Sequence, residues 1–285
     1  MNNINIKTAF FGSSEFSVIV LEELKSNGFL PGLIVTTPDK PKGRKMIISP
    51  NEVKVWGQMN NISIISPTSI RTPEFLAEIS NYPLHLTASY GKIIPDSVIQ
   101  AANKGSINVH PSLLPKFRGP SPLQSTILNN EKDTGVTLML IDKEVDHGAI
   151  VAQEKITLNK WPISFDELAN ITGKIGAKLF LKILPDWLNG QIKPQEQDHS
   201  TATFTKKVEK VNGEIDLNND PYKNYLKICA YSDWPKTYFF AEKDDKKIRV
   251  IIKEAEFADN QLIIKRVIPE GKNEMSYQDF QRGLK

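Results

Sequence analysis

Three polar side chains of this sequence, Asn108, His110 and Asp146, could together move a proton and stabilise an oxyanion. Asn108 and His110 stand two residues apart in a short apolar run typical of a strand, so their side chains point to one face. Asp146 follows a later run of the same kind, and its carboxylate can orient an imidazole and favour its protonated form. These properties suit the transfer of a one-carbon acyl group between two nitrogens, because that reaction forms an oxyanion and relocates a proton.

The chain after His110 is stiff, which favours a pre-organised site over a strand end that merely carries polar residues. Pro111 and Pro115 restrict the backbone, and Gly119 lets it reverse. Taken alone, the loop fits structural rigidity as well as catalysis. The later loop that carries Asp146, together with the order of the two loops along the chain, favours catalysis over structural rigidity.

The chemistry assigns a role to each of the three candidate catalytic residues. His110 stabilises the oxyanion and moves the proton to the leaving nitrogen. Asn108 donates its amide to the same oxygen. Asp146 orients His110, directly or with an ordered water.

Short apolar runs alternate with amphipathic stretches, a pattern typical of a Rossmann-like, mostly parallel α/β sheet. The predicted strands are residues 6–11, 32–36, 62–65, 84–89, 106–109, 134–141 and 149–156. The predicted helices are residues 15–26, 72–80, 95–102 and 164–188. In such sheets ligands bind beyond the carboxyl ends of the strands, and Asn108 and His110 stand at such an end.

The length of 285 residues suits two domains. A polar segment at 189–206 predicts a linker between a catalytic domain at 1–188 and a small β-rich domain at 207–285. In the second domain, residues 246–257 and 261–267 are predicted strands.

Composition excludes several classes of protein. The single cysteine, Cys229, excludes an intrachain disulfide and is predicted to be a buried packing residue. The chain has no signal-like start and no apolar run of membrane length, so we expect a cytoplasmic protein. The histidines and the cysteine lack metal-ligand spacing, so no metal is expected. A net charge of +3 permits nucleic-acid binding without demanding it.

The other histidines are assigned no chemistry. His85 lies inside a predicted strand and should be a satisfied packing residue. His199 lies in the predicted linker and should be solvated.

Several segments occur in the order found in one family. They are Phe10–Ser13, Thr37–Pro41, Ser89–Pro95, Ser106–Pro115, Phe117–Gly119, Pro122–Gln124, Thr134–Thr137 and Val145–Gly148. This set resembles the formyltransferases that use 10-formyltetrahydrofolate, and within them the methionyl-tRNA formyltransferases. The resemblance implies a formyltransferase fold followed by a small OB-like β-barrel, with 10-formyltetrahydrofolate as co-substrate. By position in the family's motifs, the residues expected at the folate are Ile93, Ile94, Ser112, Leu113, Leu114, Pro115 and Val145.

The resemblance also implies the acceptor, the α-amine of initiator methionyl-tRNA. Four cations, Lys40, Lys42, Arg44 and Lys45, stand where the tRNA enzymes carry a loop that grips the acceptor arm. An amino-sugar N-formyltransferase with the same donor is the enzymatic alternative. The non-catalytic alternative is a folate-binding or RNA-binding protein that carries out no reaction.

The C-terminal part departs from the family pattern. It is shorter than the family norm around residues 258–260, and from 207 to 285 it holds 15 basic and 14 acidic residues, a difference of +1. That is a small charge for a tRNA-binding domain. We expect a monomer, although no sequence pattern fixes the oligomeric state.

Overall fold

The computed structural model describes residues 6–42, 46–243 and 245–284. Two compact units divide the chain. The first is drawn from Met1–Pro122, Asp133–Ile156 and Ala169–Thr205, and the second from Leu123–Lys132, Thr157–Leu168 and Lys206–Lys285. Residues 189–205 therefore belong to the first unit, whereas the sequence predicts a linker there.

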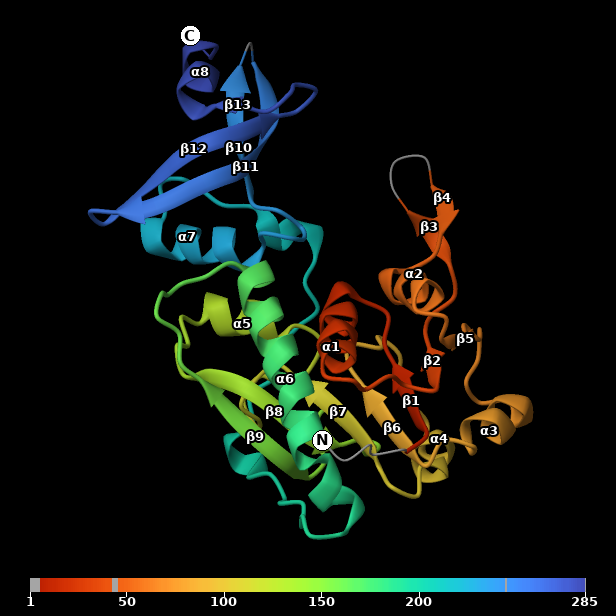
Figure 1. Cartoon of the computed structure of the whole chain (residues 1–285). Coiled ribbons are helices and arrows are strands. Elements are labelled where there is room, and N and C mark those ends of the chain that lie inside the picture. Colours follow the sequence, from red (N-terminus) through yellow and green to blue (C-terminus); the bar gives the residue numbers. More distant parts are fainter. Residues whose placement is uncertain (1–5, 43–45, 244, 285) are drawn as a thin grey trace. The chain divides into compact units, whose positions relative to one another are not determined.

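A seven-stranded sheet forms the centre of the first unit, in the order β5-β2-β1-β6-β7-β8-β9 (Figure 1). Its strands are β1 (Thr8–Phe11), β2 (Leu33–Val35), β5 (Ser63–Ile65), β6 (Leu84–Thr87), β7 (Ser106–His110), β8 (Thr134–Leu140) and β9 (Ile150–Ile156). Neighbouring strands from β5 to β7 pair in parallel, which confirms a mostly parallel α/β sheet.

The helices follow the predicted apolar spacing where they were expected. In α1 the four apolar positions Phe16, Val20, Leu21 and Leu24 are all buried. The helices before residue 189 are α1 (Glu15–Ser26), α2 (Glu52–Met59), α3 (Pro73–Ile79), α4 (Asp96–Ala101), α5 (Pro122–Leu128) and α6 (Phe165–Leu188), of which α5 and the start of α6 belong to the second unit. Sequence reasoning did not predict α2 or α5.

One face of the sheet packs under α3 and α4 and forms an apolar core. Phe11 and Val35 of the sheet belong to it together with Phe75, Ile79 and Val98 of the two helices. This core fixes the strands whose ends carry the polar residues of interest.

Strand β8 pairs antiparallel with both of its neighbours, β7 and β9. This pairing determines where the Asp146 loop lies. Ile107 is opposite Leu140 and His110 is opposite Thr137, so β8 ends beside the start of β7. The loop after β8 must therefore return along β7 to bring Asp146 to His110. A short connection joins β8 to β9, and a connection of that length fits an antiparallel pair but not a parallel one.

A two-stranded hairpin replaces the loop expected after residue 39. It consists of β3 (Lys40–Lys42) and β4 (Ile47–Ser49), with Pro41 opposite Ile48. Lys-Pro-Lys has little strand propensity, so no strand was predicted at residues 40–42. Met46, Ile47 and Ile48 are exposed in this hairpin.

The second unit contains an open antiparallel sheet in the order β10-β11-β12-β13. Its elements are α7 (Pro221–Ala230), β10 (Tyr238–Lys243), β11 (Lys246–Ala258), β12 (Gln261–Pro269), β13 (Met275–Ser276) and α8 (Tyr277–Arg282). Within the described residues no pairing joins β10 to β13, so the expected OB-like barrel is not confirmed. Asp259 and Asn260, both at positive φ, form the tight turn between β11 and β12.

Cys229 is buried in α7, as predicted, and burial raises the pKa of its thiol to about 11. No helix in the described ranges is long and apolar enough to cross a membrane.

Candidate active site

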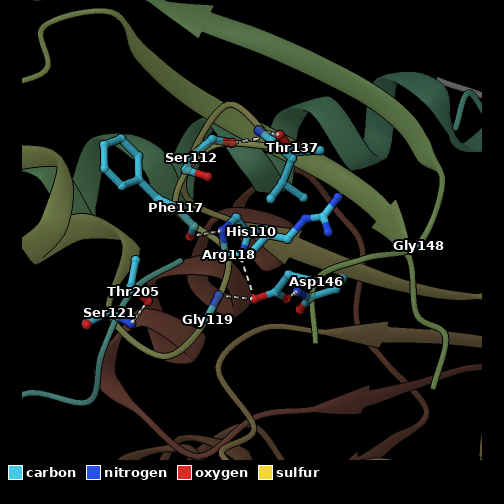
Figure 2. Close-up of polar contacts among 12 residues, drawn as sticks. His110, Ser112, Phe117, Arg118, Gly119, Ser121, Thr137, Asp146, Gly148 and Thr205 are labelled. Atoms are coloured by element: carbon cyan, nitrogen blue, oxygen red, sulfur yellow. Dashed lines mark hydrogen bonds and ion pairs between the residues drawn. The ribbon is translucent and has the colours of Figure 1, made fainter. Parts of the chain in front are cut away.

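The three predicted side chains converge in the structure. Asn108 and His110 lie on one face of β7, and the carboxylate of Asp146 lies against both. Asn108 Nδ2 donates to Asp146 Oδ1 at 3.4 Å, and His110 Nδ1 lies 3.6 Å from Asp146 Oδ2. Figure 2 shows the imidazole of His110 and the carboxylate of Asp146 directed toward one another.

His110 is 3% exposed, and both its ring nitrogens face protein oxygens. Nε2 lies 3.0 Å from the carbonyl oxygen of Phe117. Because a carbonyl oxygen only accepts, Nε2 carries the ring hydrogen in this arrangement. The 3.6 Å between Nδ1 and Asp146 Oδ2 is an ion-pair distance and too long for a hydrogen bond. Nδ1 is therefore the nitrogen left for chemistry.

Asp146 is held by the backbone as well as by side chains. Its Oδ2 accepts a hydrogen bond of 2.8 Å from the backbone N–H of Gly119 (Figure 2). Its φ is +50°, a conformation that aspartate tolerates better than most residues but that costs free energy unless neighbours hold it. The loop at Asp146 is therefore fixed by its contacts rather than by its own preference.

Gly119 occupies a position that no other residue fits. Its φ is +110°, and a Cβ there would lie 2.7 Å from Thr205 Oγ1 and 3.0 Å from the Thr205 carbonyl oxygen. Only glycine lets Thr205 approach so closely while the Gly119 N–H still points at Asp146.

A dense set of hydrogen bonds holds the loop after His110. Thr137 Oγ1 donates to the Ser112 carbonyl at 2.7 Å and accepts from the Leu114 N–H at 3.1 Å. Gln153 Nε2 donates to the Leu114 carbonyl at 2.8 Å. Ser112, fully buried, donates from Oγ to the Lys116 carbonyl. These bonds give the loop the rigidity that its prolines suggest.

Residues 6–184 of the chain match the family model described as formyl transferase. The chain belongs to the formyltransferase family. It is 36% identical over 237 residues to the methionyl-tRNA formyltransferase of Chloroflexus aurantiacus, an alignment that covers 82% of this chain and 76% of that relative.

Solved structures share the formyltransferase fold. The methionyl-tRNA formyltransferase of Clostridium thermocellum superposes with a TM-score of 0.65 at 20% identity, covering 93% of this chain and 98% of that one. The N-formyltransferase of Helicobacter canadensis, solved with folinic acid and dTDP-3-aminofucose, superposes with a TM-score of 0.61 at 21% identity, covering 89% of each chain. At these identities the likeness establishes the fold.

The residues expected at the donor of this formyltransferase fall into two groups. Ile93 is 75% exposed and Val145 is 61% exposed, so both present apolar side chains to solvent. Ile94, Ser112 and Leu114 are buried in the core or in the rigid loop, while Leu113 and Pro115 are half-buried.

Two of the four expected tRNA-contacting cations, Lys40 and Lys42, lie in β3. Lys40 is exposed in β3, and Lys42 ends that strand. Arg44 and Lys45 lie outside the described residues. Among the described residues no group of three or more His, Cys, Asp or Glu side chains could hold a metal ion.

The histidines without assigned chemistry make contacts that the sequence did not predict. His85 is buried beside Phe11, donates to or accepts from Ser106 Oγ through Nδ1, and has its pKa lowered to about 4 by desolvation. His199 is exposed, as predicted, and its ring also stacks on that of His147 with centroids 4.0 Å apart.

Sequence reasoning missed the roles of Arg118 and Gln197 in this formyltransferase. Both are buried, and Gln197 donates hydrogen bonds to the carbonyl oxygens of Asp146 and Gly148. The one available signal was Arg118, which stands within the family segment Phe117–Gly119. Gln197 lies in a polar stretch where nothing local marks it as buried.

Proposed function

We propose that this formyltransferase transfers a formyl group from 10-formyltetrahydrofolate to the α-amine of initiator methionyl-tRNA, and so serves translation initiation in the cytoplasm. The observation that carries the proposal is the convergence of Asn108, His110 and Asp146 at one point of the first unit. The tRNA as acceptor is supported by the relatives at 36% identity, which are methionyl-tRNA formyltransferases.

The geometry divides the chemical work among three side chains. The donor supplies a formyl carbon bonded to a leaving nitrogen. As the amine bonds to that carbon, His110 Nδ1 accepts the proton that the amine releases, and the carboxylate of Asp146 at 3.6 Å stabilises the imidazolium. Nδ1 then gives the proton to the leaving nitrogen as the old carbon–nitrogen bond breaks. Asn108 Nδ2, which has a second hydrogen to donate, stabilises the oxygen on which negative charge develops.

This assignment refines the role expected for His110. The Phe117 carbonyl engages Nε2, which leaves Nδ1 as the proton carrier and gives the oxyanion to Asn108. A ring whose tautomer is set by a backbone carbonyl is ready to act as a base at its other nitrogen.

The exposed apolar side chains beside the site fit a folate donor. Ile93 and Val145 lie on the two segments that the family resemblance places at the pterin, and an aromatic ring would remove their apolar surface from water. The donor would thus be recognised by apolar cover and backbone, with Ser112, Leu113, Leu114 and Pro115 shaping the loop beside it.

The tRNA would be recognised by the β3–β4 hairpin and by residues 207–285. We place the formyl transfer itself in residues 1–188. The hairpin presents the exposed Lys40 together with the apolar side chains of Ile47 and Ile48, a combination that suits contact with a phosphate backbone and with bases. An OB-like role for the second unit rests on the sequence resemblance and on its open antiparallel sheet.

Removing the hairpin charge should weaken tRNA binding more than catalysis. For the double variant Lys40→Ala with Lys42→Ala, we expect a higher KM for tRNA, a kcat close to that of the unaltered protein, and a weaker dependence on salt. The slope of log KM for tRNA against log salt should fall by roughly 1.5, because two phosphate contacts are lost.

The control for this prediction removes two lysines of α6. Lys174→Ala with Lys182→Ala deletes the same charge from exposed positions and should leave the salt slope unchanged. Equal slopes for the two double variants would show that the hairpin does not contact tRNA.

The proposed reaction is tested by offering purified protein a labelled formyl donor with charged initiator tRNA, and separately with amino-sugar nucleotides. We expect label in formylmethionyl-tRNA. Label only in the sugar would make the protein an amino-sugar N-formyltransferase. Transfer to neither acceptor would favour a folate-binding or RNA-binding protein without catalysis.

A further inference from the structure

The side chain of Gln197 uses all of its hydrogen-bonding positions. It binds the loop at residues 141–149, which carries Asp146 and is called the catalytic loop below. It is 4% exposed. Its Nε2 donates to two carbonyl oxygens of that loop, those of Asp146 at 2.9 Å and Gly148 at 2.7 Å. Its Oε1 accepts from Nε of Arg118 at 3.0 Å and from Nη2 of Arg118 at 2.6 Å. Both amide hydrogens and both lone pairs are therefore in use.

Arg118 connects Gln197 to the other side of the same loop. This guanidinium is 3% exposed, and its Nη2 also lies 2.8 Å from Nδ1 of His199. The His199 ring stacks on His147, the residue after Asp146, with an interplanar angle of 3°. Arg118 thus binds both Gln197 and His199. Gln197 and His199 in turn contact residues 146–148 of the catalytic loop.

The same backbone segment also holds the carboxylate. Gly119, which follows Arg118, donates its N–H to Asp146 Oδ2. The backbone of Arg118 in turn pairs with the chain beyond Gln197, through an N–H bond to the Thr203 carbonyl at 2.9 Å and a bond from the Thr205 N–H at 2.7 Å. Hydrogen bonds therefore connect residues 197–205, residues 118–119 and the Asp146 loop to one another.

We propose that Gln197 is a positioning residue for formyl transfer, acting with Arg118 to hold Asp146 in the geometry that serves Asn108 and His110. This inference rests on the proposed function. The φ of Asp146 is +50°, a conformation that persists only when neighbouring contacts stabilise it. The hydrogen bond from Gln197 Nε2 to the backbone carbonyl of Asp146 is one of those contacts. Gln197 contacts the catalytic loop only through backbone carbonyls, so it acts through Asp146.

The test replaces Gln197 by glutamate. Glutamate keeps an oxygen for Arg118 but puts a second oxygen, in place of the Nε2 donor, against the carbonyls of Asp146 and Gly148. We expect Gln197→Glu to lower kcat by roughly 10- to 100-fold with the KM for donor and for tRNA within about threefold, as small misplacements of reacting groups do. Hydrogen exchange in residues 141–149 should become faster while the exchange of β1 and β6 stays the same.

The matched control is Gln195→Glu, the same change two residues earlier. Gln195 is exposed and is held through backbone bonds to Ile150, so kcat and exchange should stay within twofold of the unaltered protein. Gln197→Met, which removes the amide without adding charge, should repeat the loss of kcat if Gln197→Glu does not fold.

The outcomes are distinguishable from failure of the proposed function. If the unaltered protein does not formylate methionyl-tRNA, the function is wrong, yet the exchange comparison still reports whether Gln197 holds the loop. If either the Gln197→Glu or the Gln197→Met variant folds and keeps kcat within twofold of the unaltered protein, the positioning role is wrong. So does unchanged exchange at 141–149 in a folded variant, or a loss confined to KM.

Discussion

Asp146→Asn is expected to lower kcat by about a hundredfold to a thousandfold, the usual range for loss of an electrostatic contact to a developing charge. The carboxylate meets donors at both oxygens, Asn108 Nδ2 at Oδ1 and the Gly119 N–H at Oδ2. Asparagine has one oxygen. If that oxygen stays at Gly119, its NH₂ faces the NH₂ of Asn108, and two donors oppose each other.

The same substitution removes the negative charge beside His110. The imidazolium that forms when Nδ1 takes a proton then loses its counter-charge at 3.6 Å. Single-turnover formyl transfer to methionyl-tRNA measures the loss, and thermal unfolding shows that the protein remains folded. Glu144→Gln is the control, because it deletes an exposed carboxylate of the same loop and should change kcat less than threefold. Retention of more than a tenth of kcat in Asp146→Asn would contradict the assignment.

His110→Ala should have the largest effect, a loss of roughly a hundredfold to ten-thousandfold in kcat, the range found for general acid–base groups. The variant lacks the Nδ1 that accepts and returns the proton, and it leaves the Phe117 carbonyl without its partner. Added imidazole should restore part of the rate, because the buried space left by the ring can admit it.

The control for His110→Ala uses a second buried histidine. His85 has its pKa lowered to about 4 by burial, so it is neutral near pH 7 and is not suited to accept the transferred proton. His85→Gln should therefore keep kcat within a few-fold and show no response to imidazole. A similar loss in both variants would mean that His110 supports the fold rather than the reaction.

Local patterns predicted the parallel part of the sheet well. The spacing of Phe16, Val20, Leu21 and Leu24 encodes a helix face in consecutive residues, and the structure begins and ends α1 at the predicted residues. The antiparallel direction of β8 could not be predicted in this way. Strand direction depends on which neighbour a strand pairs with. An apolar run such as Thr134–Leu140 has the same pattern whether the strand is parallel or antiparallel to its neighbour.

The candidate site was predicted in part for a similar reason. Asn108 and His110 share a strand, so their common face follows from spacing alone, and the family motif supplies Asp146. Gly119 and Gln197 contribute through a backbone N–H and through contacts between residues far apart in sequence. The sequence indicates Gly119 only as a place where the chain can reverse, and nothing local indicates that Gln197 is buried. His199 is exposed, as predicted, but its contacts with Arg118 and His147 could not be predicted, because nothing in its polar segment indicates them.

The C-terminal region shows the limit of a family resemblance. The two strands on either side of residues 258–260 are present, as predicted, and a tight turn at Asp259 and Asn260 joins them. The closed barrel that the resemblance implies is not seen, because β10 and β13 remain the edges of an open sheet in the residues described. This is why the hairpin cations, rather than the second unit, carry the prediction on tRNA binding.

The most direct measurement is a double-mutant cycle on formyl transfer to methionyl-tRNA, using Asn108→Ala, Asp146→Asn and the two combined. Side chains that act as one unit around a single carbon give losses that do not multiply. We predict that each single variant loses at least a hundredfold in single-turnover rate and that the double variant is about as slow as the slower single one. Losses that multiply, or an Asn108→Ala variant near the unaltered rate, would contradict the claim that these residues work together.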